Sequence, residues 1–159
     1  TDEYGGSLEN RVRFVDEVLQ AMASVDGGGK VGLRICPGFP FNDVKDPEPG
    51  QTFEALLTAI QPLQLAYLHL MRASPIDIYA LAKNFFKGDF MMNGGFDRNS
   101  GNKAISEKGA SAISFATSYI ANPDLLRRLQ EDLPLSEIDQ ASLYTPGAAG
   151  YSDYTDFAG

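Results

Sequence analysis

Arg34 is the first residue whose type and position could support chemistry. It stands in the segment VGLRIC (31–36), where apolar side chains alternate with small or polar ones, as in a β-strand. A guanidinium near the carboxyl end of a strand can hold an anionic or electron-rich group, because ligands bind at that end of parallel β/α folds. The alternative is an arginine that only pairs with a carboxylate.

A second candidate site combines the ends of two later strands. In NGGF, the N–H groups of Gly94 and Gly95 can approach a phosphate closely, although such a pair is also common in ordinary turns. In FATS, Ala116 and Thr117 end a strand that leads toward a helix. Barrel phosphate sites are often built from the loops after the seventh and eighth strands. If these strands are that pair, the four residues converge on one anion.

His69 is the sole histidine and lies in the predicted strand AYLHLM. We expect it to be buried and hydrogen-bonded, because a general base needs a partner and a reacting proton within reach. No Ser-His-Asp set or nucleophile elbow can be assembled around it, and the clustered ligands of a metal site are missing. We therefore assign no catalytic residue and predict no metal.

The net charge and the cysteine content limit the classes of partner and the cellular setting that we expect. The chain has 21 acidic and 13 basic residues in 159, a formal charge of −8, which disfavours nucleic acid. The single cysteine, Cys36, cannot form an intramolecular disulfide, which favours a cytoplasmic setting. We find neither a leader nor an apolar run of the roughly 20 residues that span a bilayer.

Helical and strand patterns alternate along the chain. Ser7 is the predicted N-cap of the first helix, which stops in DGGGK, and Asn122 is the predicted N-cap of the last. The predicted strands are 31–36, 65–71, 89–93 and 112–116, and the helices between them are 52–60, 76–86 and 102–110. This alternation predicts parallel βα units and an α/β fold.

The side chains of the first strand help to choose between an open sheet and a barrel. Central strands of an open α/β sheet are apolar on both sides, whereas Gly32, Arg34 and Cys36 make one side small and polar. That side is typical of a barrel interior near a site. Four strands are half of an eight-stranded barrel and would leave two open edges.

Six dispersed motifs together resemble the C-terminal half of the old yellow enzyme family, the FMN-dependent ene-reductases. They are TDEYGGSLENRVRF, VGLRICPG, LAYLHLM, MNGGF, YIANPDLLRRL and LYTPGAAGYSDY, in the family's order. The resemblance implies an eight-stranded (β/α) TIM barrel. Residues 1–159 would form a single half-barrel domain, with the N-terminal half of the barrel absent.

The resemblance also implies roles for the candidate residues. Arg34 would contact the flavin ring, and Tyr144 would lie near the mouth of the active site. The FMN phosphate would be held by Gly94, Gly95, Ala116 and Thr117.

The chain departs from the family at the phosphate. The family has Gly-Arg where this chain has Ala116 and Thr117. Loss of a charge-assisted hydrogen bond, about 1.5–3 kcal/mol, would weaken FMN binding about ten- to a hundredfold. The family's substrate-holding and proton-donating residues lie in its N-terminal half, so the resemblance supplies no catalytic residue here.

We therefore expect part of an FMN-dependent oxidoreductase that passes hydride from NAD(P)H through the flavin to activated alkenes such as enones. It would be incompetent as a lone chain and would need an N-terminal half-barrel chain or a second copy of itself. The alternative is a non-catalytic half-barrel module that binds a phosphorylated ligand or self-associates.

Overall fold

A sheet of four parallel strands organises the structure, a computed structural model that describes residues 2–39, 43–72 and 76–158. The strands are β1 (Gly32–Ile35), β2 (Tyr67–Met71), β3 (Asp89–Asn93) and β4 (Ala112–Ser114). Each pairs in parallel with the next in sequence, giving the order β1-β2-β3-β4. The prediction of four parallel strands in βα units is confirmed. Within the described residues, β1 and β4 each have one unpaired edge.

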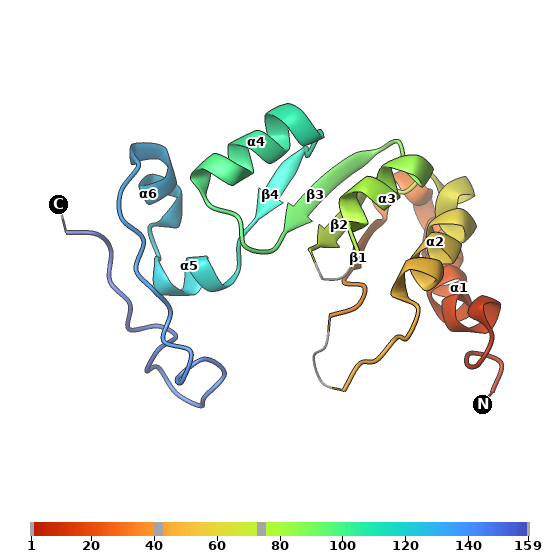
Figure 1. Cartoon of the computed structure of the whole chain (residues 1–159), viewed down its shortest axis with the longest axis horizontal. Helices are drawn as coiled ribbons and strands as arrows, with labels where there is room; N and C mark the ends of the chain where they lie inside the picture. Colours follow the sequence, from red (N-terminus) through yellow and green to blue (C-terminus); the bar gives the residue numbers. More distant parts are fainter. Residues whose placement is uncertain (1, 40–42, 73–75, 159) are drawn as a thin grey trace.

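The helices follow the strands in an α/β alternation. They are α1 (Leu8–Asp26), α2 (Pro49–Ile60), α3 (Ile78–Phe85), α4 (Arg98–Lys108), α5 (Thr117–Ala121) and α6 (Leu125–Glu131), with 3-10 turns η1 (Gly28–Lys30) and η2 (Gln61–Leu63). Helices α1 and α2 lie at one end of the molecule, and α5, α6 and the C-terminal tail lie at the other (Figure 1).

The start and end of α1 agree with the sequence prediction. The Ser7 side chain caps the helix by accepting a hydrogen bond from the N–H of Asn10 at 3.2 Å. Gly27 ends it with a φ of 84°, a conformation that glycine adopts without strain.

The predicted cap of the last helix is wrong. Helix α6 begins at Leu125 with Asp124, not Asn122, in the N-cap position. Asn122 is fully buried, and its amide donates to the Ser118 carbonyl at 2.8 Å while its oxygen accepts from the Ser136 N–H at 2.7 Å. These partners connect the end of α5 to the tail, so Asn122 stands at the C-terminus of α5 and does not cap the start of α6.

Several other element ends also differ from the predicted ranges, among them the start of α4 and the end of β4. Helix α4 begins at Arg98, ahead of the predicted 102, because Asp97 and Ser100 form a reciprocal capping box. Strand β4 ends at Ser114, and Thr117 already begins α5. The prediction that Ala116 and Thr117 end the strand is therefore wrong: Thr117 is the first residue of a helix, and Phe115 and Ala116 separate it from β4.

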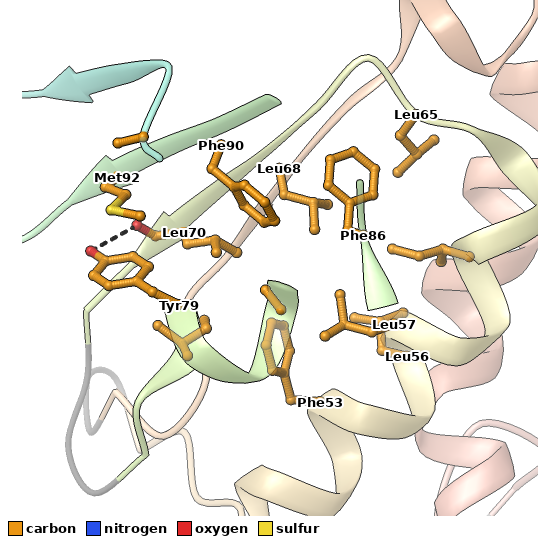
Figure 2. Packing of buried hydrophobic residues seen from close by; sticks show 14 of the residues in the cluster. Phe53, Leu56, Leu57, Leu65, Leu68, Leu70, Tyr79, Phe86, Phe90 and Met92 are labelled. Atoms are coloured by element: carbon orange, nitrogen blue, oxygen red, sulfur yellow. Dashed lines mark hydrogen bonds between the residues drawn. The ribbon is translucent and has the colours of Figure 1, made fainter. Parts of the chain in front are cut away.

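The hydrophobic core lies on one face of the sheet, between the strands and helices α2 and α3 (Figure 2). Alternate residues of β2 and β3 point into it, as the two-residue period of a strand requires. The buried side chains include Phe53, Leu57, Ile60, Leu68, Leu70, Ile78, Ala82, Phe90 and Met92. The intervening residues face the other side, which is more open: Tyr67 is 40% exposed.

Candidate functional site

A cavity of about 660 Å³ lies at the carboxyl ends of the strands. Its walls come from the ends of all four strands, the loops that follow them and the C-terminal tail. The structure brings together there every site residue that the sequence analysis selected: Arg34, Gly94, Gly95, Ala116, Thr117 and Tyr144. A separate cavity of about 400 Å³ between α4 and α6 contains none of them.

Arg34 presents its guanidinium to this cavity from the end of β1. Its Nη2 atom lies 3.5 Å from Oδ1 of Asn93 and 3.6 Å from Sδ of Met71. In the described part of the chain it forms no ion pair with a carboxylate. Among these residues, the alternative that Arg34 serves only to pair with a carboxylate therefore does not hold. A guanidinium has five N–H donors, so most of these remain available to a ligand.

Asn93 is a site residue that the sequence analysis missed. It is buried at the end of β3, and its amide donates to the Ser114 carbonyl at 2.8 Å while its oxygen faces Arg34. Its own carbonyl accepts from the Tyr79 hydroxyl at 2.8 Å. The side chain therefore links β1, β3 and β4 at the cavity wall. The sequence feature that could have identified Asn93 is its position directly before Gly94, on the same strand face as Met91.

The Gly94–Gly95 turn requires glycine at both positions. Their φ angles are 109° and 66°, in the region that other residues rarely adopt. A Cβ on Gly94 would also stand 3.2 Å from Cβ of Arg72. Among the described residues, neither glycine N–H donates a hydrogen bond. The turn therefore offers two free donors at the cavity.

Tyr144 lines the same cavity from the C-terminal tail. Its side chain is 83% exposed, and its φ of 68° is unusual for a residue other than glycine. Two other tail aromatics pack instead: the Tyr154 hydroxyl accepts from the Asp139 N–H at 2.9 Å, and Phe157 lies under the Arg128 guanidinium. The tail thus brings one exposed phenol to the cavity and anchors itself with the others.

The model of the NADH:flavin oxidoreductase / NADH oxidase family matches residues 1–136. The chain belongs to this family. It is 37% identical to a probable flavin mononucleotide-dependent alkene reductase of Leishmania infantum, covering 97% of this chain and 43% of that protein. It is 34% identical to 12-oxophytodienoate reductase 1 of Oryza sativa subsp. japonica, covering 97% and 43%.

Solved structures of the family show the same fold. The old yellow enzyme from Trypanosoma cruzi superposes with a TM-score of 0.87 at 31% identity, covering 99% of this chain and 44% of that one. Morphinone reductase in complex with tetrahydroNAD gives 0.82 at 34% identity, with the same coverage. The chain therefore spans less than half the length of these family members. Its four parallel strands agree with the expected half of a (β/α)8 barrel.

His69 is the remaining polar residue of interest in this member of the flavin oxidoreductase family. It faces away from the core on β2 and is partly buried, and its Nε2 lies 2.8 Å from Oγ of Ser114. Burial and then the positive charge of Arg34 lower the pKa of His69 below its usual 6.5. The expectation of a hydrogen-bonded histidine is confirmed, and the ring lies outside the residues that line the cavity.

A pH dependence of stability follows from the lowered pKa of His69. The unfolded chain binds the proton more tightly than the folded protein, so stability rises with pH between the two pKa values. This contribution is present above about pH 6.5 and is lost as pH falls through the pKa of the folded protein. We expect the urea concentration at the unfolding midpoint to decrease when the pH is lowered from 7.5 to 5.5. In His69→Gln this decrease should be smaller. An equal pH dependence in both proteins would contradict this role.

The described part of the chain holds neither a metal-binding cluster nor a helix that could span a membrane. Residues 2–39, 43–72 and 76–158 contain no group of three or more His, Cys, Asp or Glu side chains placed to hold a metal ion. Over the same ranges, no helix is both long enough and apolar enough to cross a bilayer.

Proposed function

We propose that this chain supplies the C-terminal half of an FMN-dependent NAD(P)H oxidoreductase that reduces activated alkenes such as enones. The observation that carries the proposal is one cavity lined both by Arg34, which pairs with no described carboxylate, and by Gly94 and Gly95, whose N–H groups donate no hydrogen bond. Membership of the flavin oxidoreductase family supports the choice of FMN among phosphorylated ligands.

The residues present are chemically suited to FMN. The cavity of about 660 Å³ falls within the size range of small-molecule sites, about 300–1,000 Å³. Arg34 would hold the flavin ring and stabilise negative charge on it. The phosphate would be held by Gly94, Gly95, Ala116 and Thr117. Bound FMN supplies the hydride chemistry, and the chain's own residues bind and orient it.

A second half-barrel would complete the sheet. Helix α1 buries Val12 and Leu19 but also carries an outward apolar stripe: Phe14, Val18, Met22 and Val25, 61%, 41%, 50% and 84% exposed. The stripe and the open edge of β1 belong to consecutive elements, so one added βα unit could cover both. We propose that residues 1–159 are one half-barrel domain whose partner is an N-terminal half-barrel or a second copy.

The absorption spectrum of the purified chain tests this function. We expect a flavin spectrum after incubation with FMN and gel filtration, and oxidation of NAD(P)H by an enone once a complementary half-barrel is added. A colourless chain that dimerises and binds inorganic phosphate would instead support the alternative, a non-catalytic module. The free N–H groups of Gly94 and Gly95 would serve either ligand.

Replacing Thr117 by arginine should tighten FMN binding. Thr117 lines the cavity and carries no charge, so a guanidinium there would add a charge-assisted hydrogen bond to the phosphate. We expect Thr117→Arg to lower the FMN dissociation constant about tenfold or more, measured by quenching of flavin fluorescence. Thr58→Arg is the matched control, because Thr58 is exposed on α2 and lies outside the cavity lining. Equal affinities for Thr117→Arg and the unmodified chain would show that the phosphate does not lie there.

A further inference from the structure

Arg72 is, with Arg34, one of two arginines that pair with no carboxylate in the described part of the chain. From its position we propose that Arg72 binds the phosphate of a phosphomonoester ligand at the Gly94–Gly95 turn. In doing so it would supply the positive charge that Thr117 lacks. The proposal rests on the proposed function for the identity of the ligand as FMN, and it concerns only the phosphate end of the cavity.

The ion pairs of the chain single out Arg72 and Arg34. The chain has seven arginines and a formal charge of −8, so carboxylates are plentiful. Five of the arginines form ion pairs: Arg11 with Asp46, Arg13 with Glu9, Arg98 with Asp132, Arg127 with Glu131 and Arg128 with Asp124. Arg34 and Arg72 form none with any described carboxylate, and no residue outside the described ranges has an acidic side chain.

Both unpaired arginines lie at the same end of the sheet. Arg34 is near the end of β1, and Arg72 directly follows β2. Asp77, which follows in the chain, uses its Oδ1 to cap α3 by accepting from the N–H groups of Tyr79 and Ala80. Positive charge is therefore left uncompensated at the strand ends, where the cavity lies.

The contacts of Arg72 hold its guanidinium beside the turn. Its backbone N–H donates to the Asn93 carbonyl at 2.8 Å, which fixes its Cα next to Gly94. Its Nη2 lies 3.2 Å from where a Cβ would stand on Gly95. Its Cζ lies 5.9 Å from the centroid of the Phe96 ring. Gly95 and Phe96 both line the cavity, and the Arg72 guanidinium stands beside these two residues although Arg72 is not itself among the lining residues.

This arrangement suits a phosphate dianion. A guanidinium offers planar paired donors that match phosphate oxygens, and stacking on an aromatic ring limits its rotamer freedom. The free N–H groups of Gly94 and Gly95 add neutral donors in the adjacent turn. Arg72, at the end of β2, would thus neutralise the charge of the phosphate. Thr117 would contribute only hydrogen bonds from its hydroxyl and backbone groups.

Paired titrations with FMN and riboflavin test this role, because the two ligands differ only in the phosphate. We expect Arg72→Gln to weaken FMN binding about tenfold and to leave riboflavin binding unchanged, with Arg72→Lys between the two. Arg127→Gln is the matched control, since Arg127 is an exposed arginine on α6 outside the cavity lining. Circular dichroism checks that each variant is folded.

Each other outcome has a definite meaning. Equal losses for FMN and riboflavin, or no loss for FMN, would overturn the role of Arg72. If the chain binds neither flavin, calorimetric titration with inorganic phosphate decides. Phosphate binding that Arg72→Gln weakens would refute the flavin function but support the anion site. Absence of phosphate binding would overturn both proposals.

Discussion

Replacing Leu70 by alanine is expected to lower the free energy of unfolding by about 3–5 kcal/mol. Leu70 lies near the carboxyl end of β2 with its side chain completely buried, in the core between the sheet and helices α2 and α3 (Figure 2). Removing its methyl groups loses their transfer free energy and leaves a cavity that the strand cannot close, because both neighbouring strands hold it in place.

Urea denaturation of the purified chain, followed by circular dichroism, measures this effect. The matched control is Leu126→Ala, the same change on α6 at a side chain that is 63% exposed. We expect the control to change stability by less than about 1 kcal/mol, because little apolar area is lost from the interior. Similar losses for the two variants would contradict the assignment of Leu70 to the core.

Replacing Arg128 by methionine is expected to destabilise the protein by about 3 kcal/mol or more and to release the C-terminal tail. The Arg128 side chain is 3% exposed and pairs with Asp124 at 2.6 Å. It also donates to the Pro134 carbonyl, the Ser136 hydroxyl and the Thr155 carbonyl at 3.0–3.1 Å. Methionine keeps the length but removes every donor, leaving buried acceptors unpaired.

Limited proteolysis and urea denaturation together test this prediction. We expect faster cleavage after α6 in Arg128→Met, because the guanidinium joins that helix to two separate stretches of the tail. Arg13→Met is the control: the Arg13 side chain is 36% exposed on α1, at the other end of the molecule from the tail, and pairs with Glu9, a surface contact worth about 0.2–1 kcal/mol. If Arg128→Met left the tail as resistant as the control does, the tail would be held by its other contacts, such as the hydrogen bonds of Ser136 to Asn122 and of Phe157 to Asp124.

The sequence predicted the elements better than their ends. The apolar alternation in β2 and β3 and the glycines after α1 are local signals, and the structure follows them. The N-cap prediction for Asn122 failed because the residue types that cap helices also form hydrogen bonds with buried backbone groups. Only the position of the tail in the folded structure shows that Asn122 bonds to the backbone of Ser118 and Ser136. The start of α4 at Arg98 was not predicted because its capping box pairs Asp97 with Ser100, which differs from the usual Ser/Thr-x-x-Glu/Gln pattern.

The candidate site was predictable in its residues but not in its electrostatics. Strand-end positions and the family motifs selected six residues that the structure places around one cavity. Asn93 and Arg72 were missed, since their importance depends on contacts across neighbouring strands. Whether an arginine has a carboxylate partner is likewise a property of tertiary structure. That property separates Arg34 and Arg72 from the other five.

The sequential strand order has a kinetic consequence. Because each strand pairs with the next one in the chain, every closure of the sheet spans one helix and its loops. The cost in chain entropy of each closure is therefore smaller than for a pairing of strands that are more distant in sequence. We expect β2 and β3, which share the longest register, to pair early and to act as a template for β1 and β4. The sheet would then grow outward in both directions from its middle.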